Sequence, residues 1–112
     1  MKLLYWLDEW LTLPQDEQQT RLPISGGDLL GDVFVKYHFI DINKPLLFTF
    51  SPAGTNYQEH DLNDDFSPWG FQLAQKQHVN VISFQHLGIS NWFRHRNLLF
   101  FLEQLAPLLT PF

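Results

Sequence analysis

The sequence predicts one small α/β domain over residues 1–112, and three observations support this fold class. Apolar residues make up 45% of the chain, including 11 Phe and 4 Trp, which is enough material for a hydrophobic core. The length of 112 residues suits one core rather than two. Helical and strand-like patterns follow one another without a linker or a repeat, in the order helix, strand, strand, helix, strand, helix.

The N-terminal segment 1–14 has the pattern of an amphipathic helix. Its apolar residues recur three and four positions apart until Pro14 and a polar stretch end the pattern. Because two exposed tryptophans would be costly, we expect the apolar face to pack on its own domain, with a partner protein as the alternative. The residues of this face are Leu3, Leu4, Trp6, Leu7, Trp10 and Leu11.

Two strands are predicted next. Pro23 and Gly26-Gly27 indicate a turn, after which the alternation of segment 33–40 predicts a strand with one buried and one partly wet face. The apolar run Leu46–Phe50 suits a strand that is buried on both faces, as in a parallel sheet.

The second half of the chain predicts a helix, a strand and a final helix. Ser67 is expected to cap a helix over 68–77, with the proline that follows it at the first helical position. Small residues four positions apart, Gly70 and Ala74, would let this helix approach the sheet closely. The apolar run 79–84 then closes a strand-helix-strand unit, whose crossover is right-handed in nearly all proteins.

The final helix is expected to begin at a cap formed by Ser90 or Asn91 and to reach about residue 106. Leucines on one stripe would bury its inner face. They are Leu98, Leu102, Leu105 and Leu109.

The composition excludes several classes of function. The net charge is −5 with only seven Lys and Arg, and no basic stripe could follow a nucleic-acid backbone. Without cysteine the chain has no disulfide, thiolate nucleophile or cysteine-bound zinc. Acidic residues interrupt the N-terminal apolar segment, and no run approaches the roughly 18 apolar residues of a membrane span. We therefore expect a cytoplasmic protein with neither a nucleic-acid nor a membrane partner.

Two loops are candidates for chemistry, because ligands of open α/β sheets bind at the carboxyl ends of strands. The first, 51–56, follows the strand Leu46–Phe50. Backbone N–H groups of Ala53, Gly54 and Thr55 could approach an anion or a developing oxyanion there. The alternative is a plain strand-to-helix turn.

The second loop precedes the final helix and has the glycine and serine spacing of the nucleophile elbow G-x-S-x-G. Trp92 stands at the last glycine position and would crowd the tight turn, so we interpret Ser90 as a helix cap and expect no catalytic residue here. Asn91 remains a candidate for anion binding. Arg94 and Arg96 are further candidates, because they lie in the first turns of the helix, where the helix dipole disfavours cations.

Either a bound anion or an acidic loop would compensate these arginines, and solvated side chains are the alternative. The acidic loop also carries a histidine, but it lacks the ligand spacing of a calcium loop or a zinc helix, so we expect no metal and no cofactor. Its charged residues are Glu59, His60, Asp61, Asp64 and Asp65.

Four segments carry a family resemblance. They are Pro45-Leu46-Leu47-Phe48-Thr49-Phe50-Ser51-Pro52-Ala53-Gly54-Thr55, Phe66-Ser67-Pro68-Trp69-Gly70, Val81-Ile82-Ser83 and Asn91-Trp92-Phe93-Arg94. Together they resemble the N-terminal part of a group of bacterial α/β-hydrolase-fold proteins, over roughly residues 30 to 110. The resemblance implies a hydrolase-like half-domain over 30–112. Its fold would be a small three-layer α/β sandwich whose mixed, mostly parallel sheet carries an antiparallel edge strand.

The resemblance also bears on activity. In that group the final helix is followed by a strand and an elbow of the type Y-G-S-S-M-G-G, which carries the serine nucleophile, with the acid and the histidine further on. This chain ends at Phe112, so a half-domain without nucleophile or triad is implied; a completed fold would be a serine hydrolase or esterase. The strand 79–84 would lie inside the sheet. Leu46–Phe50 would form an open edge, where the missing strand would pair.

Three hypotheses of function follow. The first is a catalytically incompetent hydrolase-like half-domain. The second is a protein-binding or self-assembly module, either a homo-oligomer or a complex with a complementing chain, that uses the edge Leu46–Phe50, the Trp6 and Trp10 face, or both. The third is a small enzyme or anion-binding protein that uses backbone donors at Gly54 with Arg94 and Arg96.

Overall fold

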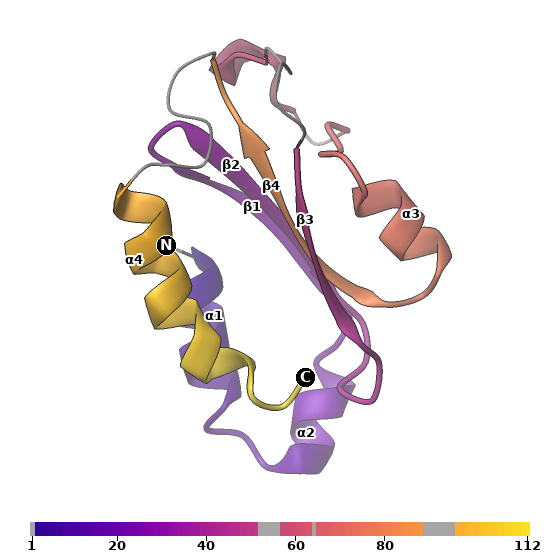
Figure 1. The fold of residues 1–112 in the computed structure, drawn as a ribbon. Helices are drawn as coiled ribbons and strands as arrows, with labels where there is room; N and C mark the ends of the chain where they lie inside the picture. Colours follow the sequence, from indigo (N-terminus) through magenta and orange to yellow (C-terminus); the bar gives the residue numbers. More distant parts are fainter. Residues whose placement is uncertain (1, 52–56, 64, 89–95) are drawn as a thin grey trace.

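A mixed four-stranded sheet forms the centre of the computed structural model, which describes residues 2–51, 57–63, 65–88 and 96–112 (Figure 1). The strand order is β1-β2-β4-β3. β2 is antiparallel to both its neighbours, and β3 is parallel to β4. The fold is therefore α/β. The resemblance implies a mostly parallel sheet, but the described sheet has two antiparallel strand pairs and one parallel pair. The strands are β1 Ile24–Leu30, β2 Val33–Phe39, β3 Leu46–Phe50 and β4 Asn80–His86.

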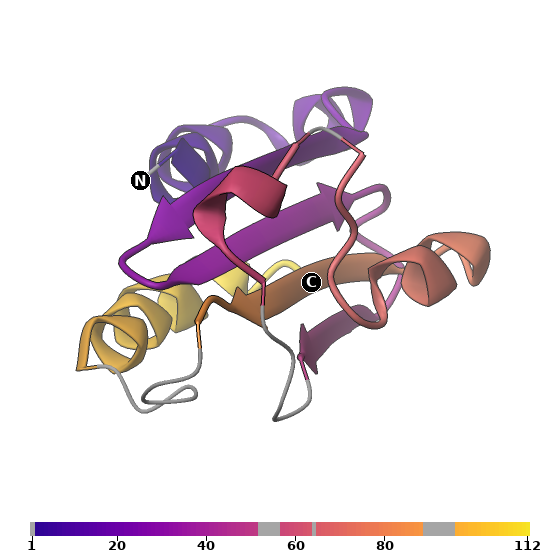
Figure 2. The ribbon, with the colours of Figure 1, turned by 90° about the horizontal axis from the view of Figure 1, so that it is seen from above.

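Helices lie against both faces of this sheet. α1 and α4 pack on one face, while the short α3 packs against the other face at β4 (Figures 1 and 2). No helix in the described part of the chain is long and apolar enough to cross a membrane. The predicted cytoplasmic location stays a prediction. The helices are α1 Lys2–Trp10, α2 Gln15–Thr20, α3 Phe71–Lys76 and α4 Arg96–Leu105, with 3₁₀ turns η1 Glu59–Asp61 and η2 Ala106–Leu109.

The main core lies between the sheet and the helices α1 and α4. The prediction that the N-terminal helix packs on its own domain is confirmed, because Trp10 is 1% exposed and Trp6 stacks on both Trp10 and Phe39, at 5.4 and 5.9 Å between ring centroids. The predicted leucine stripe of the last helix also faces this core. The buried residues are Leu3, Leu7, Trp10, Val33, Val35, Tyr37, Phe39, Ile82, Phe84, Leu98, Phe101 and Leu105.

A second, smaller core holds α3 to the opposite face of β4 through Phe71, Ala74 and Val81. The helix begins at Phe71 rather than at residue 68, and Ser67 does not cap it. The reason is Gly70, whose left-handed backbone (φ 83°) occupies the position before the first helical residue.

β1 and α2 are elements that sequence reasoning missed. Gly26-Gly27, interpreted as a turn, lies within β1, where the rings of Tyr37 and Phe34 cover the two glycines from β2. A Cβ atom on Gly27 would lie 2.7 Å from the Phe34 ring, so the strand tolerates glycine because a neighbouring aromatic fills the missing volume. α2 buries no residue; its carbonyl at Gln18 accepts a hydrogen bond from the Trp10 indole at 2.9 Å.

The strand Leu46–Phe50 differs from its prediction as a strand buried on both faces. β3 pairs with β4 alone in the described sheet, so it lies at the outer edge. Leu47 and Phe48 are each 44% exposed, and Phe50 is 40% exposed. The expectation that β4 lies inside the sheet and that β3 forms an open edge is thus met in the described residues.

Candidate functional site

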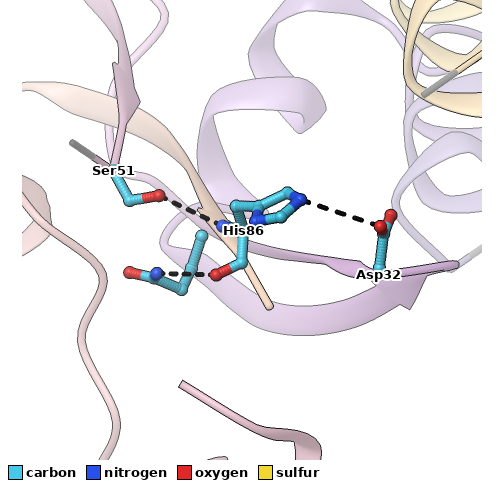
Figure 3. Close-up of polar contacts among 4 residues, drawn as sticks. Asp32, Ser51 and His86 are labelled. Atoms are coloured by element: carbon cyan, nitrogen blue, oxygen red, sulfur yellow. Dashed lines mark hydrogen bonds and ion pairs between the residues drawn. The ribbon is translucent and has the colours of Figure 1, made fainter. Parts of the chain in front are cut away.

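The strands that precede the two candidate loops are β3 and β4. These strands are parallel, so their carboxyl ends meet at one edge of the sheet. Ser51 links the two strand ends: its N–H donates to the carbonyl of Phe84 at 2.9 Å, and its Oγ accepts from the N–H of His86 at 3.1 Å (Figure 3). The buried Ser51 therefore holds the carboxyl end of β3 in register with that of β4.

His86 and Asp32 stand beside Ser51 at this edge. The imidazole Nε2 lies 3.7 Å from an oxygen of Asp32, which belongs to the turn between β1 and β2. His86 is 2% exposed. Figure 3 shows the ring extending toward Asp32, whereas the bond from Ser51 runs to the peptide nitrogen of His86. Serine, histidine and aspartate thus lie close together here, but Ser51 bonds the backbone of His86 rather than its imidazole. The contacts therefore hold the strand ends together and do not form a nucleophile-base-acid triad.

Two further backbone hydrogen bonds involve the residues that follow β4. The N–H of Leu87 donates to the carbonyl of Asp32 at 2.8 Å, and the N–H of Gly88 donates to the carbonyl of Tyr57 at 2.8 Å. Tyr57 also forms an isolated parallel bridge with Leu87. The chain therefore returns to pair with the end of β4 after segment 52–56.

The structure describes only some of the predicted site residues. Ala53, Gly54, Thr55, Asn91 and Arg94 lie outside the described residues, so their role in anion binding stays a prediction. Arg96 is the first residue of α4. Within the described ranges, no three His, Cys, Asp or Glu residues gather as a metal site would require.

A second site, which sequence reasoning missed, lies on the face of the sheet that carries α3. A cavity of about 560 Å³ opens there between the hairpin β1–β2 and segment 59–63, a size that suits a small ligand. Apolar, polar and charged side chains all line this cavity. The lining side chains include Ser25, Leu29, Phe34, Lys36, Glu59, Leu62 and Asn63.

Ser25, which lines this cavity, forms a side-chain pair with His38. They stand directly opposite each other in the antiparallel register, so both side chains project to the same face, and Ser25 Oγ hydrogen-bonds His38 Nδ1. Burial lowers the pKa of His38 below the ordinary value of 6.5. Only recognition of β1 would have revealed this pair, because its residues lie 13 positions apart.

Lys36, in the middle of β2, also lines this cavity. Its ammonium donates to the carbonyl of Phe66 at 2.6 Å and lies 4.8 Å from the centre of the Phe71 ring. The lysine therefore ties the segment before α3 to the middle of β2 through a hydrogen bond and a cation–π contact.

Comparison with known proteins adds no assignment to this geometry: no protein-family model, no curated protein and no solved structure gives a significant match to the chain.

Proposed function

We propose that this domain is an assembly module in which the β3 edge pairs with the β3 edge of a second copy of the chain. One observation carries the proposal: the outer edge strand exposes Leu47, Phe48 and Phe50 by 40 to 44% and contains no charged residue and no proline. Natural sheets commonly protect open edges with charges, prolines or bulges, and an unprotected apolar edge is a template for pairing.

The backbone of β3 supports the same proposal. The N–H of Ser51 and the carbonyl of Pro45 both point to β4, since they bond Phe84 and Asn80. Strand residues alternate in direction, so the polar backbone groups of Leu46, Phe48 and Phe50 point outward. A neighbouring strand would pair with the outward groups of Leu46 and Phe48.

A two-fold axis through Phe48 suits these outward groups. It would pair Leu46 of one copy with Phe50 of the other in an antiparallel ladder, and it would set the two Phe48 side chains side by side on one face. Phe48 and Phe50 already stack on Phe84, at 6.3 and 4.9 Å between ring centroids, so the pairing would extend an existing aromatic layer. The other outer strand, β1, is less suited because it contains Asp28 and two glycines.

Solution mass tests this proposal, with Phe48→Lys as the disruptive variant and Tyr5→Lys as its matched control. Tyr5 lies on α1 and is 77% exposed, so its replacement adds the same charge far from β3. At roughly 50 μM, where a dimer of micromolar Kd predominates, we expect dimers for the original chain and for Tyr5→Lys, and a folded monomer for Phe48→Lys. A monomeric original chain, or an unchanged mass for Phe48→Lys, would contradict the proposal.

A second candidate is the hydrolase-like half-domain, for which the missing strand is supplied by a complementing segment or chain. The position of β4 inside the sheet, with β3 open beside it, supports this candidate because the resemblance implies that arrangement. Helices on both faces are also consistent with the three-layer sandwich of that group. In that family the nucleophile, acid and histidine all follow the position of the final helix, so residues 1–112 would take part in serine hydrolysis only together with such a segment.

The DNA downstream of the codon for Phe112 separates the two candidates. Translation in all three frames should reveal a strand followed by G-x-S-x-G if the chain is half of a hydrolase. Three frames without such a motif, together with dimerisation through β3, would favour the assembly module.

A further inference from the structure

We propose that Ser25 and His38 form a nucleophile–base pair that reacts with activated carboxylic esters bound in the cavity beside β1. This inference is independent of the β3 edge and of the family elbow, because it uses a serine and a histidine on the opposite part of the sheet. It follows from three features of the site: the contact between the two side chains, the access to Ser25, and the donors around it.

The contact has the geometry that serine activation requires. Ser25 Oγ lies within hydrogen-bond distance of His38 Nδ1, and the paired strands hold both residues in register. A histidine activates a serine only when the facing nitrogen is unprotonated. Burial of His38 against α3 favours that neutral form, since its ring packs edge-on to Phe71 at 6.4 Å between centroids.

Ser25 is also accessible to a ligand. It lies on the exposed face of β1 and lines the 560 Å³ cavity, whereas Ser51 and Ser83 are both fully buried. Phe34 and Leu62 give the cavity apolar surface for an acyl chain or an aromatic leaving group. Among the described serines, Ser25 thus combines access with a histidine contact.

Backbone donors lie beside the serine. β1 is an outer strand, so alternate N–H groups along it point away from β2. An outward N–H near Ser25 could donate to the carbonyl oxygen of a bound ester, in the role of an oxyanion-hole donor.

The reaction balances with an ester and water as its only reactants. Ser25 Oγ adds to the carbonyl carbon while its proton passes to His38 Nδ1. The C–O bond to the leaving group then breaks, and the leaving alcohol or phenol takes that proton. Water next adds to the acyl-serine, giving a proton to His38. Release of the acid returns the proton to Ser25 Oγ.

The environment of His38 sets the pH dependence. Its neighbours are Ser25 on β1, Val81 on β4 and Phe71 on α3. The charged residues that line the cavity are Asp28 on β1, Lys36 on β2 and Glu59 on η1. The acylation rate should rise with pH as His38 loses its proton, with a midpoint below 6.5.

Acylation by p-nitrophenyl acetate tests the inference, with nitrophenol release and peptide mapping of the acetyl group as readouts. We expect a stoichiometric burst and acetylation of Ser25. Ser25→Ala should abolish both, and His38→Gln should slow the burst by roughly 100-fold, the lower range of general-base catalysis. Ser67→Ala and His60→Gln are the matched controls, because Ser67 lies in a different cavity beside α3 and His60 is a largely exposed surface residue.

The pH profile of the original chain keeps the test valid if His38→Gln does not fold. A burst whose rate has its midpoint below 6.5 supports the pair. An acetyl group on another residue, a burst that survives in Ser25→Ala, or a midpoint at or above 6.5 would overturn it.

Discussion

Gly70 is the position at which backbone conformation and packing can be separated most cleanly. Its φ of 83° is left-handed, and a Cβ atom there would lie 2.8 Å from Thr49 Cγ2 and 3.1 Å from Thr49 Cβ. Thr49 cannot move aside freely, because its hydroxyl bonds Ser83 on β4 and its side chain is short. Gly88 has a similar φ of 75°, but no described residue lies within 4 Å of a Cβ added to it.

Gly70→Ala should therefore cost more free energy of unfolding than Gly88→Ala. The left-handed conformation costs an alanine about 1–2 kcal/mol at either position. Overpacking against Thr49 adds about 1–3 kcal/mol at Gly70 alone. Urea unfolding followed by circular dichroism measures both, and with m near 2 kcal/mol/M the midpoint of Gly70→Ala should fall below that of Gly88→Ala by roughly 0.5–1.5 M. Equal losses in the two variants would refute the close approach of α3 to β3.

Three further predictions concern the core and the titratable residues. Phe101→Ala should lower the unfolding free energy by about 3–5 kcal/mol, whereas Phe100→Ala, at a 60% exposed position on the same helix, should change it by about 0.5 kcal/mol or less in urea unfolding. Asn80→Leu should lower the free energy of unfolding by about 3 kcal/mol or more, because the buried amide hydrogen-bonds four backbone groups between Ile40 and Lys44. Asn43→Leu, at an exposed position, is the control, and equal losses of unfolding free energy in the two variants would contradict this role of Asn80. Burial and the nearby carboxylate of Asp28 raise the pKa of Tyr37 above 10.0, so stability should be fully present below pH 10 and fall as pH rises through the folded pKa; a Tyr37→Phe variant that shows the same alkaline loss would contradict the assignment.

The parts of the fold that sequence predicted best are those with strong periodicity. The N-terminal helix, the alternating strand at β2 and the leucine stripe of α4 each place their apolar residues in the main core. These patterns are local and reflect which face of an element meets the core, so they can be recognised from a single chain.

The missed elements depend on contacts between distant residues. Gly26 and Gly27 indicate a turn when taken alone, and only the rings of Tyr37 and Phe34 on the next strand explain why they lie in β1. α2 has no apolar stripe and is held by its carbonyl bond to Trp10. Long-range packing of this kind overrides local propensity.

The candidate sites show the same division. The rule for strand ends predicted that the two candidate loops follow strands at the same end of the sheet, and Ser51 and His86 lie at the carboxyl ends of β3 and β4. The pair Ser25 and His38 required the register of a hairpin whose first strand was not recognised. The exposure of Leu47, Phe48 and Phe50 likewise depends on strand order, which an apolar run alone does not determine.

Hydrogen exchange of the β3 amides tests the central proposal, assembly through this edge, most directly. The outward N–H groups of Leu46 and Phe48 should gain protection as the protein concentration rises, while the inward N–H of Thr49 should be protected at every concentration. In Phe48→Lys, the N–H of Leu46 should exchange rapidly at all concentrations. Exchange of Leu46 and Phe48 that is independent of concentration in the original chain would contradict pairing of β3 with a second copy.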